Sequence, residues 1–452
     1  MASLTYMQLI RGNRSFRRLL AGQVVSELGN WFNFIAGLGL VRAVSAAAPE
    51  ATATMMVLRL APFALFAPLA GTFVDRWSRR KVMIVTDAAR AVVALGFLLV
   101  SGPEDLWIAY ACTIIATLLA AFFEAAKNAA MPNIAGDSGL LAGNALMFSS
   151  RFLLMSLGAA LGGWASARFG YHAAFIINAL SFIVSAYSIW LIPEEEMKPH
   201  ENTDEGAAVE KASGVGFREK QSFWQDLREG WAFIARHPLV ASIIGINVLW
   251  GLGGGACNLV YDRLGGVVFA GSSGLQPDAG VATLYATVGA GAFVGMLLAR
   301  RVGAHVELRG VTAGFIGWML IIHGILFAIG GLMPSLLSVG VFFFLSRVVI
   351  GMEFALQETM LLRSLPDRLR GRVITTDRAA EIFIMSISTI FAGWSLHLIT
   401  PRTLTIISGL ISASPGLIWL VLFAWGKLRL PLQKEPEQES EQGDETLLAS
   451  AG

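Results

Sequence analysis

The feature of this sequence that most limits its fold is a succession of apolar runs, each about as long as a membrane is thick. A helix needs roughly 20 mostly apolar residues to cross the hydrocarbon core of a bilayer. Helices suit lipid because they satisfy their own backbone hydrogen bonds. The sequence therefore predicts an all-α membrane protein with twelve transmembrane helices, at 20–45, 52–74, 83–100, 106–126, 147–168, 172–192, 239–260, 279–299, 311–331, 336–357, 374–399 and 404–425.

Composition agrees with a membrane protein and excludes other classes. Hydrophobic side chains make up 55% of the chain and charged ones 15%, against about 25% charged in soluble domains. The net charge of +2 gives no concentrated basic face for a nucleic-acid partner. Cys112 and Cys257 both lie in apolar runs, without disulfide or metal-ligand spacing. We therefore expect no metal site and no bound cofactor.

The basic residues predict the orientation and the organisation of the chain. They gather in every second loop, which places those loops and both termini in the cytoplasm by the positive-inside rule. The first apolar run is too long for the core of a signal peptide, so it is expected to be retained as a span. The expected units are a six-helix bundle at 1–192, a cytoplasmic linker at 193–237, a second six-helix bundle at 238–426 and a disordered acidic tail at 427–452.

An internal repeat supports the division into two bundles. Glu124 precedes Pro132 by the same interval as Glu358 precedes Pro366, at matching places in the two halves. A glycine-to-arginine stretch after the second span likewise has a worn counterpart after the eighth span. Parallel repeats of this kind place a substrate site between the halves, near the bilayer midplane.

The loop after the second span carries the sharpest motif, Gly71-Thr-Phe-Val-Asp75-Arg76-Trp77-Ser78-Arg79-Arg80-Lys81. It resembles the signature loop of the major facilitator superfamily, with Ser78 where that signature usually has glycine. The resemblance implies two six-helix bundles that rock about a central cavity, in a monomer of a bacterial cytoplasmic membrane. It also implies a latch on the cytoplasmic side, whose members would be Gly71, Asp75, Arg76, Arg79, Arg80, Glu124, Glu358, Arg370 and Arg372.

Within this latch the resemblance pairs Asp75 with Arg79, and Glu124 is a candidate third member. Gly71 would let two helices approach closely. Ala299 stands at the second-half position that matches Asp75, so we expect the latch to be asymmetric.

The resemblance extends over nearly the whole chain and is similar to the branch of macrolide-efflux and enterobactin-export transporters. The stretches that carry it include Asn13-Arg-Ser-Phe16, Ser26-Glu27-Leu28-Gly29-Asn30-Trp31, Leu141-Ala-Gly-Asn144, Phe175-Ile-Ile-Asn178 and Pro366-Asp-Arg-Leu-Arg370-Gly-Arg372. In the fifth span, Gly158-Ala-Ala-Leu-Gly162-Gly163 is similar to the end of the superfamily's antiporter motif. Ala159 replaces its proline, and a small-residue packing face explains the glycines equally well.

Polar and charged side chains inside the spans are the best candidates for the substrate or proton cavity, because charge in hydrocarbon is costly. They are Glu27, Asn30, Arg59, Glu353 and Glu381. The alternative for each charged residue is a structural interhelical pair. As a hypothesis, Glu27 or Glu353 is the protonation site, since a low-dielectric cavity favours the neutral form of a carboxyl group.

Together these features predict proton-coupled efflux of a hydrophobic or amphiphilic small molecule, such as a drug or siderophore. The proton gradient would supply the energy, and the partners would be the substrate and the lipid bilayer. A lysophospholipid or other lipid transporter and a non-transporting membrane sensor are the alternatives. An enzyme is not expected, because the six histidines are scattered and no convergent catalytic set appears.

Overall fold

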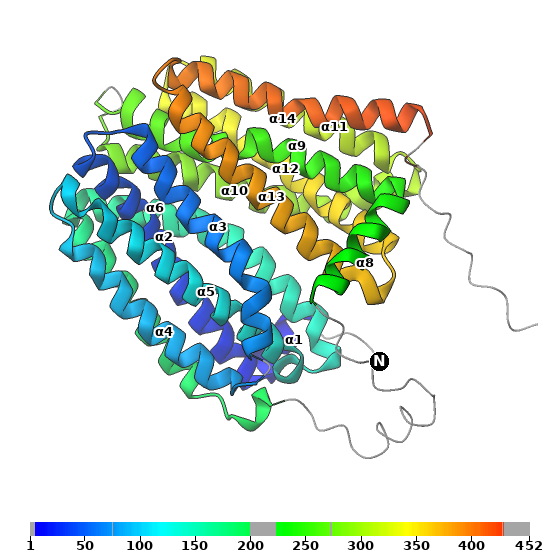
Figure 1. Ribbon diagram of the computed structural model, residues 1–452, viewed down its shortest axis with the longest axis horizontal. Helices are drawn as coiled ribbons and strands as arrows, with labels where there is room; N and C mark the ends of the chain where they lie inside the picture. Colours follow the sequence, from blue (N-terminus) through cyan, green and yellow to red (C-terminus); the bar gives the residue numbers. More distant parts are fainter. Residues whose placement is uncertain (1–4, 75, 199–222, 272–273, 427, 429–452) are drawn as a thin grey trace, which may run out of the picture.

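The computed structural model describes residues 5–74, 76–198, 223–271, 274–426 and 428 (Figure 1). Within these ranges the chain is helical and contains no β-strand, as the apolar runs predicted. Parts of the expected linker (199–222) and nearly all of the expected disordered tail (427–452) lie outside the described residues.

The first group of helices runs to residue 190, and each expected span lies on one of its long helices. Its members are α1 Tyr6–Gly12, α2 Arg14–Val44, α3 Pro49–Val74, α4 Arg79–Gly96, α5 Leu106–Ala135 and α6 Asp137–Trp190. The α6 helix is broken at Gly170, whose φ of 78° is non-helical, between the expected spans 147–168 and 172–192. A second glycine in the left-handed region, Gly136 with φ 66°, separates α5 from α6.

The second group starts after the linker and matches the other six expected spans. Its members are α8 Phe223–Arg236, α9 Pro238–Arg263, α10 Pro277–Leu308, α11 Thr312–Leu332, α12 Leu336–Ser364, α13 Asp367–Ser395 and α14 Pro401–Ala424. Three of these begin with proline, which fits the first helical position because its missing N–H has no partner there anyway.

In the described part of the chain, ten helices are long and apolar enough to cross a membrane. This number counts α6 once, although Gly170 divides it. It leaves out α13, whose first half carries polar and charged residues such as Arg372, Asp377 and Glu381. The all-helical membrane fold is confirmed, while the count of twelve spans stays a prediction.

Each group packs mainly on itself. In the first, α6 packs on α2 and α4, and α5 lies against α3 and α4. In the second, α11 packs on α14, α10 on α12, and α9 on α13 and α14. The two groups meet where α6 packs on α10 and α3 on α13 (Figure 1). The candidate site lies along this contact.

Candidate functional site

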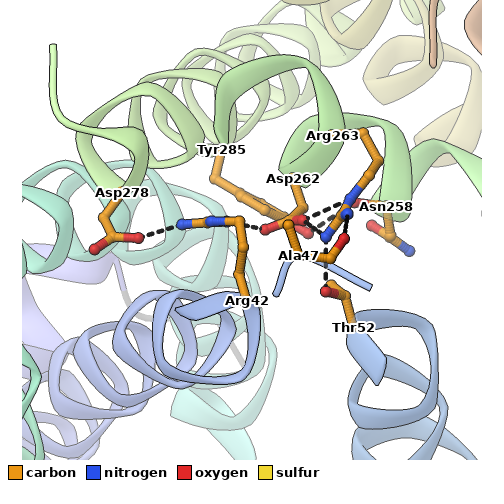
Figure 2. Close-up of polar contacts among 8 residues, drawn as sticks. All are labelled: Arg42, Ala47, Thr52, Asn258, Asp262, Arg263, Asp278 and Tyr285. Carbon is orange, nitrogen blue, oxygen red and sulfur yellow. Dashed lines mark hydrogen bonds and ion pairs between the residues drawn. The ribbon is translucent and has the colours of Figure 1, made fainter. Parts of the chain in front are cut away.

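A cluster of buried charges joins the two groups of helices beside the last turn of α2 (Figure 2). Arg42, near the end of α2, forms ion pairs with Asp262 of α9 and Asp278 of α10. Arg263 lies beside them, with its Nη2 2.5 Å from an oxygen of Asp262. Two arginines thus face two aspartates with all four side chains buried. We call these four residues the Arg42 cluster.

The Arg42 cluster also forms hydrogen bonds with the turn between α2 and α3. Arg263 donates from Nη1 to the carbonyl oxygen of Ala47 at 2.6 Å and from Nη2 to the hydroxyl of Thr52 at 2.8 Å (Figure 2). Ala46 and Ala47 have φ values of 51° and 61°. The left-handed region costs an L-residue about 1–2 kcal/mol, so the bond from Arg263 holds a strained turn in place.

Glycines make room for these charges. A Cβ at Gly39 would overlap the carboxylate of Asp278, and one at Gly266 would lie 2.6 Å from Nη1 of Arg42. Buried ions need close partners, because desolvation of each costs several kcal/mol. The two glycines let the carboxylate and the guanidinium lie directly against the helix backbones.

Another arginine, Arg59 of α3, lies among aromatic rings at the contact of α2, α3 and α10. The guanidinium carbon of Arg59 is 4.0 Å from the ring centroid of Phe34 and 5.5 Å from that of Trp31. Tyr285, from the other group of helices, packs edge-on against Phe34 with centroids 5.2 Å apart. We call Trp31, Phe34, Arg59 and Tyr285 the Arg59 cage.

The Arg59 cage contains two donors without partners. The structure shows no hydrogen bond or ion pair between Arg59 and any described residue, and the buried indole nitrogen of Trp31 has none either. Glu27 and Asn30 lie half-buried on α2. Glu27 acts on Arg59 electrostatically, but the two form no ion pair.

The acidic candidates of the second group differ in their partners. Glu353 of α12 is 2% exposed, and its Oε1 has no hydrogen-bond partner in the described part of the chain. Glu381 of α13 accepts from Arg378 at 2.8 Å, and Arg378 also contacts Glu358 at 3.3 Å. Of the acidic candidates here, Glu353 alone has no arginine beside it among the described residues.

A neighbouring polar set connects α9, α12 and α13. The side-chain amide of Asn247 donates to both oxygens of Asp377, at 3.1 and 3.0 Å, and its own oxygen accepts from Gln357 at 2.8 Å. Nearby on α12, Arg347 donates to the hydroxyl of Tyr261 at 2.5 Å. Arg347 thus has a hydrogen-bond partner on α9.

The model of the Major Facilitator Superfamily matches residues 19–375 of the chain. The chain belongs to the Major Facilitator Superfamily. The relatives with curated names that resemble it are transporters. The predicted membership of this membrane-protein superfamily is therefore confirmed, and the named relatives are transporters, not enzymes.

Among superfamily relatives, YfiS of Bacillus subtilis (strain 168), an uncharacterised MFS-type transporter, is 28% identical over 234 residues. The match covers 51% of this chain and 52% of YfiS, so the chain spans about half the length of that relative. BacE of the same organism, a proposed bacilysin exporter, is 24% identical over 346 residues, which cover 75% of this chain and 78% of BacE.

Solved structures of the superfamily share the fold. A bacterial homologue of the iron transporter ferroportin, in an inward-facing state, aligns with a TM-score of 0.63 and 15% identity over 92% of this chain and 99% of that one. A POT family transporter in complex with 5-aminolevulinic acid aligns with a TM-score of 0.67 and 12% identity over 91% and 96%. At these identities the likeness shows the fold alone.

The superfamily signature loop is described except for Asp75, so its expected pair with Arg79 lies outside the described residues. Arg79 donates to the carbonyl oxygen of Met197 at 3.2 Å, and Arg80 donates to that of Trp190. Arg76 is exposed. Arg79 and Arg80 therefore bind the last residue of α6 and the chain that follows it, within their own group of helices.

Two expectations about the latch differ from the structure. Gly71 makes no close helix contact with the residues that the structure describes, because a Cβ there would meet none of their atoms within 4 Å. Glu124 lies 2.7 Å from Lys127, one helical turn along α5, and that local pair satisfies its carboxylate in place of a contact with Arg79. In the second half, Arg370 donates from Nε to the carbonyl of Leu362 at 3.3 Å.

The remaining latch candidate, Arg372, lies on α13 against α8, where a Cβ at Gly230 would meet its Cβ at 3.5 Å. The glycines of α6 lie at tight helix contacts. A Cβ at Gly158 would be 2.7 Å from that of Trp31, one at Gly162 would be 2.9 Å from the Cα of Phe32, and one at Gly163 would overlap Ala282 of α10.

Sequence reasoning missed the Arg42 cluster. Its charges appeared as isolated residues at the ends of separate spans, with no spacing that links them. One signal was available: Arg42 ends the first span, while Asp262 and Asp278 flank the loop after the seventh. Opposite charges at the same membrane edge, in the two halves of a repeat, indicate an ion pair between the halves.

Proposed function

We propose that the protein exports a hydrophobic or amphiphilic small molecule in exchange for protons, by alternating access across a bacterial inner membrane. The observation that carries this proposal is the Arg42 cluster. It joins the two groups of helices at one end through buried ion pairs, and a rocking transporter must break such contacts and form them again in each cycle.

The proposal places the Arg42 cluster on the outer side of the membrane. With the basic loops and both termini in the cytoplasm, the cluster faces the outside and acts as an outer gate in its closed state. Substrate would then enter from the cytoplasm and reach the Arg59 cage beneath the gate. The resemblance to BacE, a proposed exporter, supports export.

Proton coupling is assigned to Glu353. A buried carboxylate without a counter-charge is costly in a membrane protein unless a proton neutralises it. Glu381 and Glu358 share Arg378, whereas Glu353 has one oxygen without a hydrogen-bond partner in the described ranges. Glu353 is therefore the best candidate to exchange a proton as the cavity alternately faces the two sides. In this proposal the latch of Asp75 and Arg79 closes the cytoplasmic side in the opposite state, and a monomer is the functional unit.

A transport assay tests the proposal. The purified full chain is placed in liposomes with an imposed pH gradient, and the movement of a fluorescent amphiphile is compared between the parent and Glu353→Gln. We expect gradient-driven movement in the parent, and loss of its dependence on the gradient in the variant. Glu104→Gln, which removes an exposed carboxylate outside the long helices, is the matched control.

The outcomes separate the candidates. Equal responses to the gradient in the parent and in Glu353→Gln would remove Glu353 from the coupling role. Movement of a lysophospholipid but of no other amphiphile would replace efflux of drug-like molecules with lipid transport on the same fold.

A further inference from the structure

Arg59 has neither an acidic partner nor a hydrogen bond among the described residues, whereas Arg347, which also has no acidic partner, donates to the hydroxyl of Tyr261. Arg42, Arg90, Arg263 and Arg378 each form an ion pair with an aspartate or glutamate. An arginine near the centre of a transmembrane helix is costly to insert into lipid, and such residues usually pair. The Arg59 cage therefore holds a cation whose counter-charge is not supplied by an ion pair within the described protein.

The geometry of the cage leaves the hydrogen-bonding edges of this cation available. Phe34 and Trp31 lie within 5.5 Å of the guanidinium carbon, where the negative faces of the rings attract a cation. Aromatic contacts do not use the N–H groups, which form a planar fork that matches a carboxylate. The buried indole N–H of Trp31 adds one more donor without an acceptor.

Unused donors at one place indicate the kind of group that would complete them. Leaving the buried indole N–H of Trp31 without an acceptor is costly, and a guanidinium such as that of Arg59 forms its strongest hydrogen bonds with a carboxylate, often through two parallel bonds. The neighbours that act electrostatically on Arg59 are Glu27, Tyr285 and Arg151, and among them and Arg59 one carboxylate opposes two guanidiniums, so the set is positive. This balance favours an anion.

The position of the cage connects this anion to transport. Trp31, Phe34 and Arg59 belong to one group of helices and Tyr285 to the other. Tyr285 also donates to the carbonyl oxygen of Asn258, one turn of α9 before Asp262 of the Arg42 cluster (Figure 2). A molecule bound in the cage would touch both groups directly beneath the proposed outer gate.

We propose that Arg59 and the indole N–H of Trp31 form a carboxylate-binding subsite, so that the transported molecule carries a carboxylate on an apolar body. The inference rests on the proposed export function and deepens it, because it names the chemical class of the substrate. The aromatic rings bind the apolar part, and the two donors bind the anionic end.

Equilibrium binding tests the subsite without any transport. The full-length protein in detergent is titrated with 1-pyrenebutyrate, with the neutral alcohol of the same length and with the corresponding primary amine, and pyrene fluorescence reports binding. We expect the carboxylate to bind at least about tenfold more tightly than the alcohol, since hydrogen bonds to charged groups contribute about 1.5–3 kcal/mol. The amine should bind more weakly than either.

Conservative variants separate recognition from misfolding. Trp31→Phe keeps the aromatic ring and removes the N–H, and Arg59→Lys keeps the charge and removes the planar fork. Each should reduce the preference for the carboxylate over the alcohol about tenfold, while alcohol binding stays within about twofold. Glu27→Gln should strengthen carboxylate binding, because it removes a nearby negative charge.

Three results would overturn the inference: no measurable binding of the carboxylate probe, equal affinity for carboxylate and alcohol, or an unchanged preference in both variants. Weaker carboxylate binding in Glu27→Gln would do the same, because it would make Glu27 part of the site instead of a competitor. Carboxylate binding that depends on Arg59, combined with no transport in any gradient, would leave the subsite standing and refute the export function alone.

Discussion

Arg42 and Asp262 are separated by 220 positions in the sequence and form a buried ion pair between α2 and α9. Asp262 is fully buried, and Arg42 is 7% exposed. Because burial removes both charges from water, each is stabilised by the other. Their contact therefore favours one arrangement of the two helix groups over others.

The first prediction concerns the energy of this pair. Asp262→Asn removes one charge and leaves Arg42 and Arg263 with a single aspartate between them. Breaking a buried pair typically costs about 3–5 kcal/mol, so we expect a clear fall in the melting temperature, measured by tryptophan fluorescence in detergent. Glu307→Gln is the control, since its ion pair with Arg363 is exposed and contributes about 0–1 kcal/mol. Similar falls in both variants would contradict the special role of the Arg42 cluster.

The second prediction contrasts two glycines. Gly266→Ala places a methyl group 2.6 Å from Nη1 of Arg42, so it should displace the guanidinium and destabilise the protein by about 1–3 kcal/mol, as overpacking does. Gly71→Ala adds a methyl group to open space and should leave stability unchanged or raise it by up to about 1 kcal/mol. Thermal unfolding of both variants provides the comparison. A larger loss in Gly71→Ala would mean that Gly71 is packed closely after all.

The third prediction concerns a contact outside the spans. The hydroxyl of Ser78 donates to Oε1 of Glu194 at 2.8 Å, and this hydrogen bond is the main reason that the pKa of Glu194 lies below its usual range. A depressed pKa means that the contact stabilises the folded protein above the ordinary glutamate pKa and loses this effect as the pH falls through the lowered value. In Ser78→Ala the pKa of Glu194 should return toward its usual range, as measured by carboxyl-carbon NMR titration.

Identical curves for Glu194 in the parent and in Ser78→Ala would rule out the hydrogen bond from Ser78 as the cause.

The fourth prediction concerns the balance between conformations. Gly163 meets Ala282 across the contact of α6 and α10, and a Cβ at Gly163 would overlap it. Gly163→Ala should therefore disfavour the state with the Arg42 cluster closed. A cysteine at the buried Thr52, in a background without Cys112 and Cys257, should react faster with a membrane-impermeant maleimide when Gly163→Ala is added. Gly71→Ala should leave the rate unchanged, and a slower reaction in Gly163→Ala would contradict the prediction.

The helices could be predicted from the sequence because their cause is local. Apolar runs of sufficient length predict spans wherever lipid surrounds the chain, and each expected span lies on a long helix. Gly170 lies between the expected spans 147–168 and 172–192, which leave almost no residues for a loop. A single non-helical residue separates them, which no hydropathy pattern distinguishes from a longer turn.

The candidate site was predictable only in part. Arg59 was identified because a charge within an apolar run has few explanations. Its neighbour Tyr285 comes from another span, and no spacing in the sequence indicates that Arg59 and Tyr285 lie close together. The Arg42 cluster depends on three helix ends that come together only in the folded protein. By contrast, the partner of Glu124 is local, because Lys127 lies three residues along the same helix. The resemblance to the signature loop pointed instead to partners on other helices.

The turn at Ala46 and Ala47 has a consequence for the speed of the transport cycle. If favourable contacts alone held the proposed gate, almost every molecule would be in the closed state. A free-energy difference of a few kcal/mol between the two conformations already makes the open one rare. Here the backbone stores about 1–2 kcal/mol at each left-handed alanine. In the proposed cycle, release of the carbonyl of Ala47 by Arg263 would let the turn relax, and the relief of strain would offset part of the ion pairing that is lost. The strained turn would then favour opening of the proposed gate.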